Sequence, residues 1–174
     1  FLFMKRMAEV TNVQAMTREF VDLPDDADPM AIGLRSVPRG VEVFEIDGPT
    51  IPLTNISTRG RVHLGDDVMI GGSISAGDSA KTVLIRARGP SMIPAGVTDA
   101  LPNPQMTLVN QSTAAIIGTN DDWGTATNAA STTATGLAPT NAFESAILVT
   151  LQPGAYTVVV SGVGGATGVG IVEV

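Results

Sequence analysis

ESAILVTLQPGAYTVVVSGVGGATGVGIVEV, residues 144–174, contains three short runs rich in Val, Ile and Thr, separated by segments that contain glycine. Such residues favour β-strands. Pro153 and Gly154 predict a turn, with proline at its second position and a residue that tolerates positive φ at its third. We therefore predict a hairpin of 144–151 with 155–162, and a tight hairpin at 162–170 before the last strand. The first two runs lack clean alternation, which predicts central strands.

The same pattern extends back to about residue 53. Short β-rich runs alternate with the turn-forming segments GDD, AGDSA, PSMIPAG, LQPG and VGGATG. Eight short strands at nearly regular spacing are typical of an antiparallel β-sandwich, here of jelly-roll-like type, with almost no helix. We expect strands near residues 55–64, 67–75, 81–89, 105–111, 114–120, 144–151, 155–162 and 169–174.

Composition limits the classes of function. The 174 residues include 44% apolar but only 4% aromatic residues, so a core of aliphatic side chains is expected. A net charge of −7 argues against a nucleic-acid partner, which requires a basic surface. The chain has no cysteine, which excludes disulfides and thiolate sites. No apolar run is long enough to span a bilayer. Since residue 1 is Phe, we expect a processed product or an excerpt.

Residues 1–52 differ from the rest and are predicted to form an N-terminal arm, separate from a sandwich domain at 53–174. In FLFMKRMAEVTNVQAMTREF, apolar residues recur at steps of three and four, which predicts a short helix over 1–20. DLPDDADP follows as a loop with four acids. VEVFEIDGPTIPL is expected to be extended, and its two prolines confine it to a sheet edge or a crossing segment.

Several motifs of residues 53–174 resemble a repeat domain of secreted and surface proteins of Verrucomicrobia and related bacteria. They are NISTRGRVHLGDDVMIGGSISAG, KTVLIRARGPSM, IGTNDDWG and ESAILVTLQPGAYTVVVSGVGGATGVGIVEV. The second half is also similar to the bacterial pre-peptidase C-terminal domain, a β-sandwich appended to secreted peptidases. The resemblance implies a secreted β-sandwich used for attachment, spacing or assembly, and it carries no catalytic residue to this chain.

The residues themselves argue against an enzyme. His63 is the sole histidine, and no serine lies in a GxSxG elbow, so a Ser-His-Asp triad has no support. GVGGATGVG lacks the third glycine of the dinucleotide fingerprint. We expect a non-catalytic protein.

TNDDWG, residues 119–124, allows two interpretations. Asn120, Asp121 and Asp122, with Glu144 from the following strand, offer the oxygen ligands that calcium prefers. The same residues also make an ordinary turn, because Asn and Asp bond their own backbone and glycine accepts positive φ. A general acid/base pair is disfavoured, because adjacent residues of one turn do not face each other across a cleft. Calcium is the single cofactor that the sequence suggests.

Arg59, Arg61, Arg86 and Arg88 occur at i, i+2 spacing on two predicted strands. If these strands are neighbours, the arginines form either a small basic patch for acidic groups, such as DLPDDADP of another copy, or a solvated face.

We expect an extracellular or cell-surface structural protein that assembles with other copies of itself, head to tail, as a filament, a pilus-like fibre or a surface layer. The alternative is a calcium- or glycan-binding adhesion module of a larger secreted bacterial protein. Either a helix in a groove or strand addition would bury the apolar arm on another copy. The residues expected to make this assembly contact are Phe1, Phe3, Met7, Met16, Phe20, Val41, Val43, Phe44 and Ile46.

Overall fold

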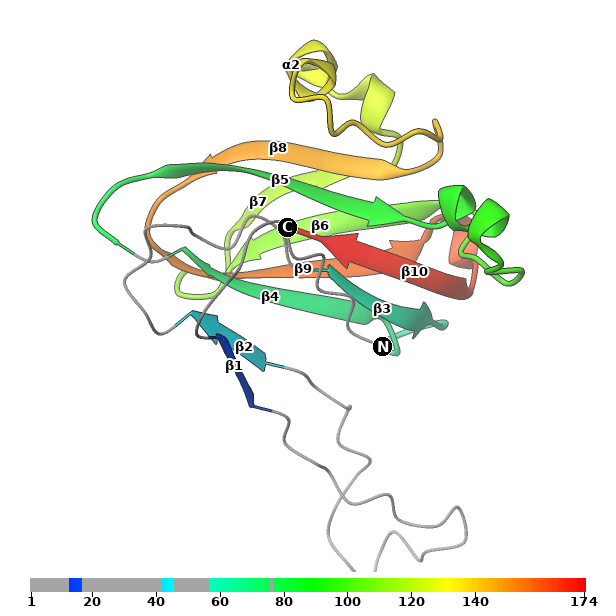
Figure 1. Cartoon of the computed structure of the whole chain (residues 1–174), viewed down its shortest axis with the longest axis horizontal. Helices are drawn as coiled ribbons and strands as arrows, with labels where there is room; N and C mark the ends of the chain where they lie inside the picture. The colour runs from blue at the N-terminus through cyan, green and yellow to red at the C-terminus, as the bar shows by residue number, and fades with distance from the viewer. Residues whose placement is uncertain (1–12, 17–41, 46–56, 76) are drawn as a thin grey trace, which may run out of the picture. The chain divides into compact units, whose positions relative to one another are not determined.

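The computed structural model describes residues 13–16, 42–45, 57–75 and 77–174 (Figure 1). The chain divides into two compact units, of which one contains Lys5–Thr54 and the other contains Asn55–Val174.

The first unit contains a two-stranded antiparallel pair, β1 (Val13–Met16) and β2 (Glu42–Glu45). Val13 lies opposite Glu45, and Met16 lies opposite Glu42. The predicted helix over 1–20 is therefore wrong for residues 13–16, because their backbone pairs with a segment almost thirty positions away instead of with its own next turn. The extended conformation predicted for VEVFE is confirmed at 42–45. Of the predicted assembly residues, those outside the described residues are Phe1, Phe3, Met7, Phe20, Val41 and Ile46.

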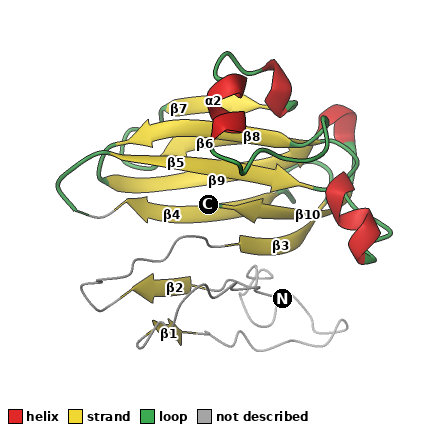
Figure 2. Cartoon of the chain, turned by 45° about the horizontal axis from the view of Figure 1, so that its top comes forward, coloured by secondary structure: helices red, strands yellow, loops and turns green. Residues whose placement is uncertain are grey.

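The second unit is an all-β sandwich of two four-stranded antiparallel sheets, so the predicted fold class is confirmed (Figure 2). All eight predicted strands are present. The first sheet has the order β3 (Ser57–Val62), β10 (Gly168–Glu173), β5 (Lys81–Arg88), β8 (Ser145–Leu151). The second has the order β4 (Met69–Ser75), β9 (Gly154–Gly162), β6 (Pro104–Asn110), β7 (Ile116–Asn120).

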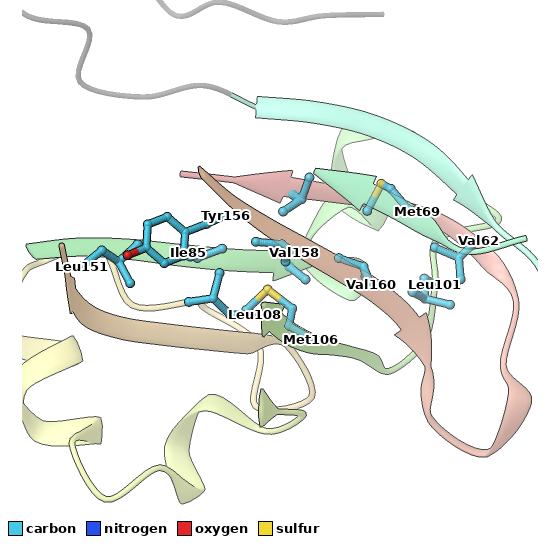
Figure 3. Close-up of a cluster of buried hydrophobic side chains, with 12 residues drawn as sticks. Val62, Met69, Ile85, Leu101, Met106, Leu108, Leu151, Tyr156, Val158 and Val160 are labelled. Carbon is cyan, nitrogen blue, oxygen red and sulfur yellow. The ribbon is translucent and has the colours of Figure 1, made fainter. Parts of the chain in front are cut away.

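The core lies between the two sheets and is built from alternate residues of each strand. In β9, Tyr156, Val158 and Val160 are buried, while the residues between them are less so. Figure 3 shows these side chains facing Ile85 of the other sheet, with Leu108 of the neighbouring strand beside Val158. The cluster of buried apolar residues is Val62, Met69, Ile85, Ala87, Leu101, Met106, Leu108, Leu151, Tyr156, Val158, Val160 and Val172.

Both predicted hairpins in 144–174 are wrong. β8 pairs with β5 in the first sheet, whereas β9 pairs with β4 and β6 in the second, and β10 returns to the first. Of the connections between the eight strands of the sandwich, six cross between the sheets, and β6–β7 is the one made within a sheet. A Pro-Gly turn specifies a reversal of the chain but not the sheet that the next strand joins. β9 is central, as predicted, but β8 is an edge strand.

Four short helical segments lie in the loops of the sandwich: η1 (Pro90–Ala95), η2 (Trp123–Thr125), α2 (Ala129–Ala134) and η3 (Val163–Gly165). The α-helix was not predicted, because AASTTA is short and the Ser and Thr residues at its centre are weak helix formers. It lies beside β8 (Figure 1).

Candidate functional site

TNDDWG lies where β7 ends, next to the edge strand β8. Asn120 is the last residue of β7, and its Oδ1 accepts a hydrogen bond from the backbone N–H of Ala146 at 2.8 Å. Its Nδ2 donates to the carbonyl of Asp122 at 3.2 Å, which fixes the turn. The N–H of Trp123 donates to the carbonyl of Glu144 at 2.9 Å. The turn is therefore bonded to the edge of the other sheet.

A second asparagine extends this contact along β8. Asn128, just before α2, donates from Nδ2 to the carbonyl of Leu148 at 2.9 Å. Glu144, Ala146 and Leu148 follow one another at steps of two, so the groups that the turn and Asn128 satisfy all face away from β5. Unpaired groups on an edge strand invite pairing with another chain. The segment 120–128 thus satisfies outward backbone groups of Glu144, Ala146 and Leu148 along the β8 edge.

The two aspartates of the turn have different surroundings. Asp121 is exposed, and its Oδ1 accepts a hydrogen bond from the N–H of Asp122 at 2.8 Å. Asp122 Oδ1 is buried without a hydrogen-bond partner, as is Trp123 Nε1. A hollow of about 290 Å³ opens beside the turn and is lined by Gln105, Met106, Thr107, Thr119, Asn120 and Asp121.

Glu144 is fully buried and points away from the turn, toward the loop after β5. Its Oε1 accepts hydrogen bonds from the backbone N–H groups of Gly89 and Ser91, both at 2.9 Å. Its Oε2 accepts no hydrogen bond and lies 3.9 Å from Nε of Arg88. A Cβ at Gly89 would lie 1.9 Å from the carbonyl oxygen of Leu101, so only glycine fits where this loop is held. Glu144 therefore fastens the β5–η1 loop to the start of β8.

The structure does not gather the four predicted calcium ligands as free oxygens. Oδ1 of Asn120 and Oε1 of Glu144 accept hydrogen bonds from backbone N–H groups. No group of three or more His, Asp or Glu side chains in the described part of the chain is placed to hold a metal ion. The calcium site stays a prediction, whereas the structural role of the turn is visible in its hydrogen bonds.

The four arginines share the outer face of the first sheet, with β10 between β3 and β5. Arg88 lies opposite Ile171, which lies opposite Arg59 on the other side. Acidic groups on the same face neutralise most of this charge. Arg86 Nη2 lies 2.8 Å from Oε2 of Glu173, Arg88 lies near both Glu173 and Glu144, and Arg61 pairs with Asp99. Among the described residues, Arg59 forms no ion pair.

The other candidates for chemistry are dispersed. The half-exposed His63 lies in the loop after β3, with Nε2 3.9 Å from Oδ2 of Asp67. Tyr156 lies in the core, where its hydroxyl donates to the carbonyl of Gln152, so it offers no surface for stacking a sugar. Within the described residues, no helix is both long and apolar enough to cross a membrane.

The sequence indicates a turn at TNDDWG but does not indicate that this turn forms hydrogen bonds with Glu144 and Ala146. Asn128 and the loop at Gly89 were not singled out, because nothing local in the sequence shows that they meet β8 and Glu144. The signal that could have pointed to such a contact is the acid Glu144 at the start of a β-rich run, since a carboxylate that becomes buried there requires donors.

Comparison with known proteins gives one distant likeness. No family model matches the chain, and no curated protein matches it. Among solved structures, the chain is similar to the pre-peptidase C-terminal domain of a collagenase from Bacillus anthracis, solved at 1.0 Å. The identity is 15%, the TM-score is 0.42, and the match covers 68% of this chain and 86% of that one. This is a distant resemblance to the pre-peptidase C-terminal domain, and the resemblance to the repeat domain of Verrucomicrobia stays an expectation.

Proposed function

We propose that this chain is an extracellular structural protein, whose β-sandwich is a building block and whose N-terminal arm, residues 1–52, joins one copy to the next. The observation that carries the proposal is that residues 62–172 enclose a continuous core between the two sheets. Within the described part of the chain, every residue of the buried apolar cluster lies in this range. Part of the β8 edge is also bonded from within the sandwich, by Asn120 and Asn128.

The arm supplies the apolar surface that the sandwich does not need. Its sequence concentrates Phe1, Phe3, Met7, Met16 and Phe20 in the first twenty residues. Large contiguous apolar patches in soluble proteins mark sites of interaction. A second copy offers a surface on which such an arm can be buried.

The described part of the arm supports strand addition over a helix in a groove. β1 contains Met16, β2 contains Val43 and Phe44, and both segments are extended. Extended segments bind through backbone hydrogen bonds to a sheet edge, with alternate side chains setting the register. Because donor and acceptor surfaces differ, each copy can bind the next, which gives rings or open filaments.

Deletion of residues 1–50 tests the proposal. We expect the truncated chain to keep its β-sheet circular dichroism and its cooperative unfolding, but to sediment as a smaller species than the full-length protein. The matched control replaces Phe1, Phe3 and Met7 with Ser in the full-length chain, which retains the length of the arm and removes part of its apolar surface. A truncated chain that assembles as the full-length protein does would refute the role of the arm.

A further inference from the structure

The two sheets of the sandwich differ completely in charge. No residue of β4, β9, β6 or β7 is charged, whereas the other sheet carries Arg59, Arg61, Lys81, Arg86, Arg88 and Glu173. The chain as a whole has a net charge of −7. An uncharged sheet in such a chain is a surface where two copies can meet without repulsion between opposing side chains.

The β4 edge of this sheet lacks the features that usually prevent strand pairing. In the part of the chain that the structure describes, β4 pairs with β9 alone, in an unbroken register from Met69 to Ser75. It has no charge, no proline and no bulge. These are the devices by which natural edge strands avoid one another. By contrast, the opposite edge strand, β7, has an irregular register with β6 and lies beside the β8 edge.

The outward side chains of β4 are symmetric about its middle residue. Ile70 and Ile74 are exposed to 60% and 72%, and Gly72 lies midway between them. If β4 of one copy runs antiparallel to β4 of another with the two Gly72 residues opposite, Ile70 of each copy lies beside Ile74 of the other. Side chains directly opposite in antiparallel strands are in contact. A shift by one residue would place outward side chains opposite inward ones, so it is excluded by the pleat.

Space at the centre also suits this pairing. Among the described residues, a Cβ at Gly72 would meet no atom within 4 Å, so these residues leave the middle of the outer face open. A register centred on Gly72 pairs all seven residues of β4, and any register shifted by two pairs fewer residues and separates the isoleucines.

We propose that β4 is a self-complementary dimerisation edge, through which two copies join their uncharged sheets into one continuous antiparallel sheet about a two-fold axis. This contact is separate from the arm, and goes beyond the proposed function. Together, a head-to-tail contact through the arm and a two-fold contact through β4 would link chains into paired filaments.

Pairwise cysteine cross-linking tests the register directly, because the chain has no cysteine of its own. The variants Ile70→Cys and Ile74→Cys are made in the full-length protein with tags of different mass. Each variant is oxidised alone, and the two are also mixed first and then oxidised together. Residues directly opposite have Cα atoms about 4.5–5.5 Å apart, within the range of a disulfide. Residues four apart along a strand are separated by roughly 13 Å. We expect a mixed disulfide dimer from the mixture and little product from either variant alone.

Two further variants control for position. Gly72→Cys should form a disulfide with its own kind, because it lies on the axis. Ile116→Cys, at an equally exposed position on the other edge of the sheet, should not. Equal yields from all combinations, or no mixed dimer from Ile70→Cys with Ile74→Cys, would overturn the proposal. The disulfide reports on β4 whether or not the arm assembles, so its failure is distinct from failure of the arm.

Salt gives an independent readout on the unmodified protein. Exposed acids flank β4, with Asp66 and Asp67 before it and Asp78 after it. In the proposed register, Asp66 and Asp67 of one copy approach Asp78 of the other, and their carboxylates repel one another. Salt screens this repulsion as the ionic strength rises. We expect the dimer fraction in analytical ultracentrifugation to increase with sodium chloride, and Ile70→Lys with Ile74→Lys to weaken dimerisation by roughly tenfold or more. A dimer that dissociates in salt, or that tolerates both lysines, would contradict a contact through β4.

Discussion

Asn120 shows how one side chain can link two sheets. It ends β7 in the second sheet and accepts a hydrogen bond from Ala146 on β8 in the first. The sequence predicted a turn here and predicted Asn120 as part of it. It could not indicate the partner, because Ala146 lies 26 positions away and belongs to the other sheet.

Asn120→Ala should therefore lower the free energy of unfolding. The substitution leaves the N–H of Ala146 without its acceptor, and an unsatisfied group of this kind costs about 1–3 kcal/mol. Urea denaturation measures the loss. Asp121→Ala is the matched control, because Asp121 is exposed and, among the described residues, its carboxylate accepts a hydrogen bond from its own neighbour, Asp122. Equal midpoints for the two variants would show that the bond to β8 adds nothing.

Glu144 gives a sharper comparison between two substitutions. Glu144→Ala removes the acceptor of two backbone N–H groups, those of Gly89 and Ser91, and leaves a cavity. Glu144→Gln retains an acceptor oxygen of nearly the same shape. We expect the alanine variant to lose about 3 kcal/mol or more in chemical denaturation, and the glutamine variant to lose clearly less. Identical losses would mean that the charge of Glu144, and not its two hydrogen bonds, holds the loop.

Chelation distinguishes the two interpretations of TNDDWG. Because Asn120 and Glu144 already accept hydrogen bonds from the backbone, we expect EDTA to leave the Tm unchanged in a sample verified to contain calcium. Calcium bound only to the folded state would stabilise it by roughly 2.7 kcal/mol at a hundredfold excess over Kd. A Tm that falls with EDTA and recovers with calcium would establish the site at Asn120, Asp121, Asp122 and Glu144.

At the scale of elements, the sequence predicts where the strands lie, but it does not predict which strands pair with one another. The alternation of KTVLIRAR correctly placed Val83, Ile85 and Ala87 on one face, because a strand buried on one side has period two. Nothing local specifies which sheet a strand enters. The Pro153-Gly154 turn therefore gave a wrong hairpin, and AASTTA gave no helical signal. The predicted helix over 1–20 failed at Val13–Met16, where pairing with a distant strand prevails over a helical pattern.

The edge strands β8 and β4 should differ in the rate at which their outward backbone amides exchange hydrogen with solvent. Ala146 lies on an edge strand, yet its N–H is bonded to Asn120. We expect slow hydrogen exchange at Ala146 in the wild type and fast exchange in Asn120→Ala. The outward amides of β4 should exchange fast in dilute protein and more slowly as concentration rises, because a second copy would cover them. Exchange at β4 that does not depend on concentration would separate it from any interface.

At the scale of the molecule, the chain divides into two compact units, one of which contains the sandwich. The sequence predicted an apolar arm before a β-sandwich, from the change of pattern near residue 53. The described sandwich encloses a core between its two sheets, and β4 pairs there with β9 alone, so we propose β4 and the arm as the elements that join copies. Assembly geometry was not predictable, because it depends on which edges remain open after folding.

Electron microscopy of the purified full-length protein tests the central proposal most directly. If the arm joins copies head to tail, images over a range of protein concentrations should show filaments or closed rings with a regular repeat, and deletion of residues 1–50 should abolish them. Dispersed particles of a single copy at every concentration would contradict the proposal that this chain is a self-assembling structural subunit.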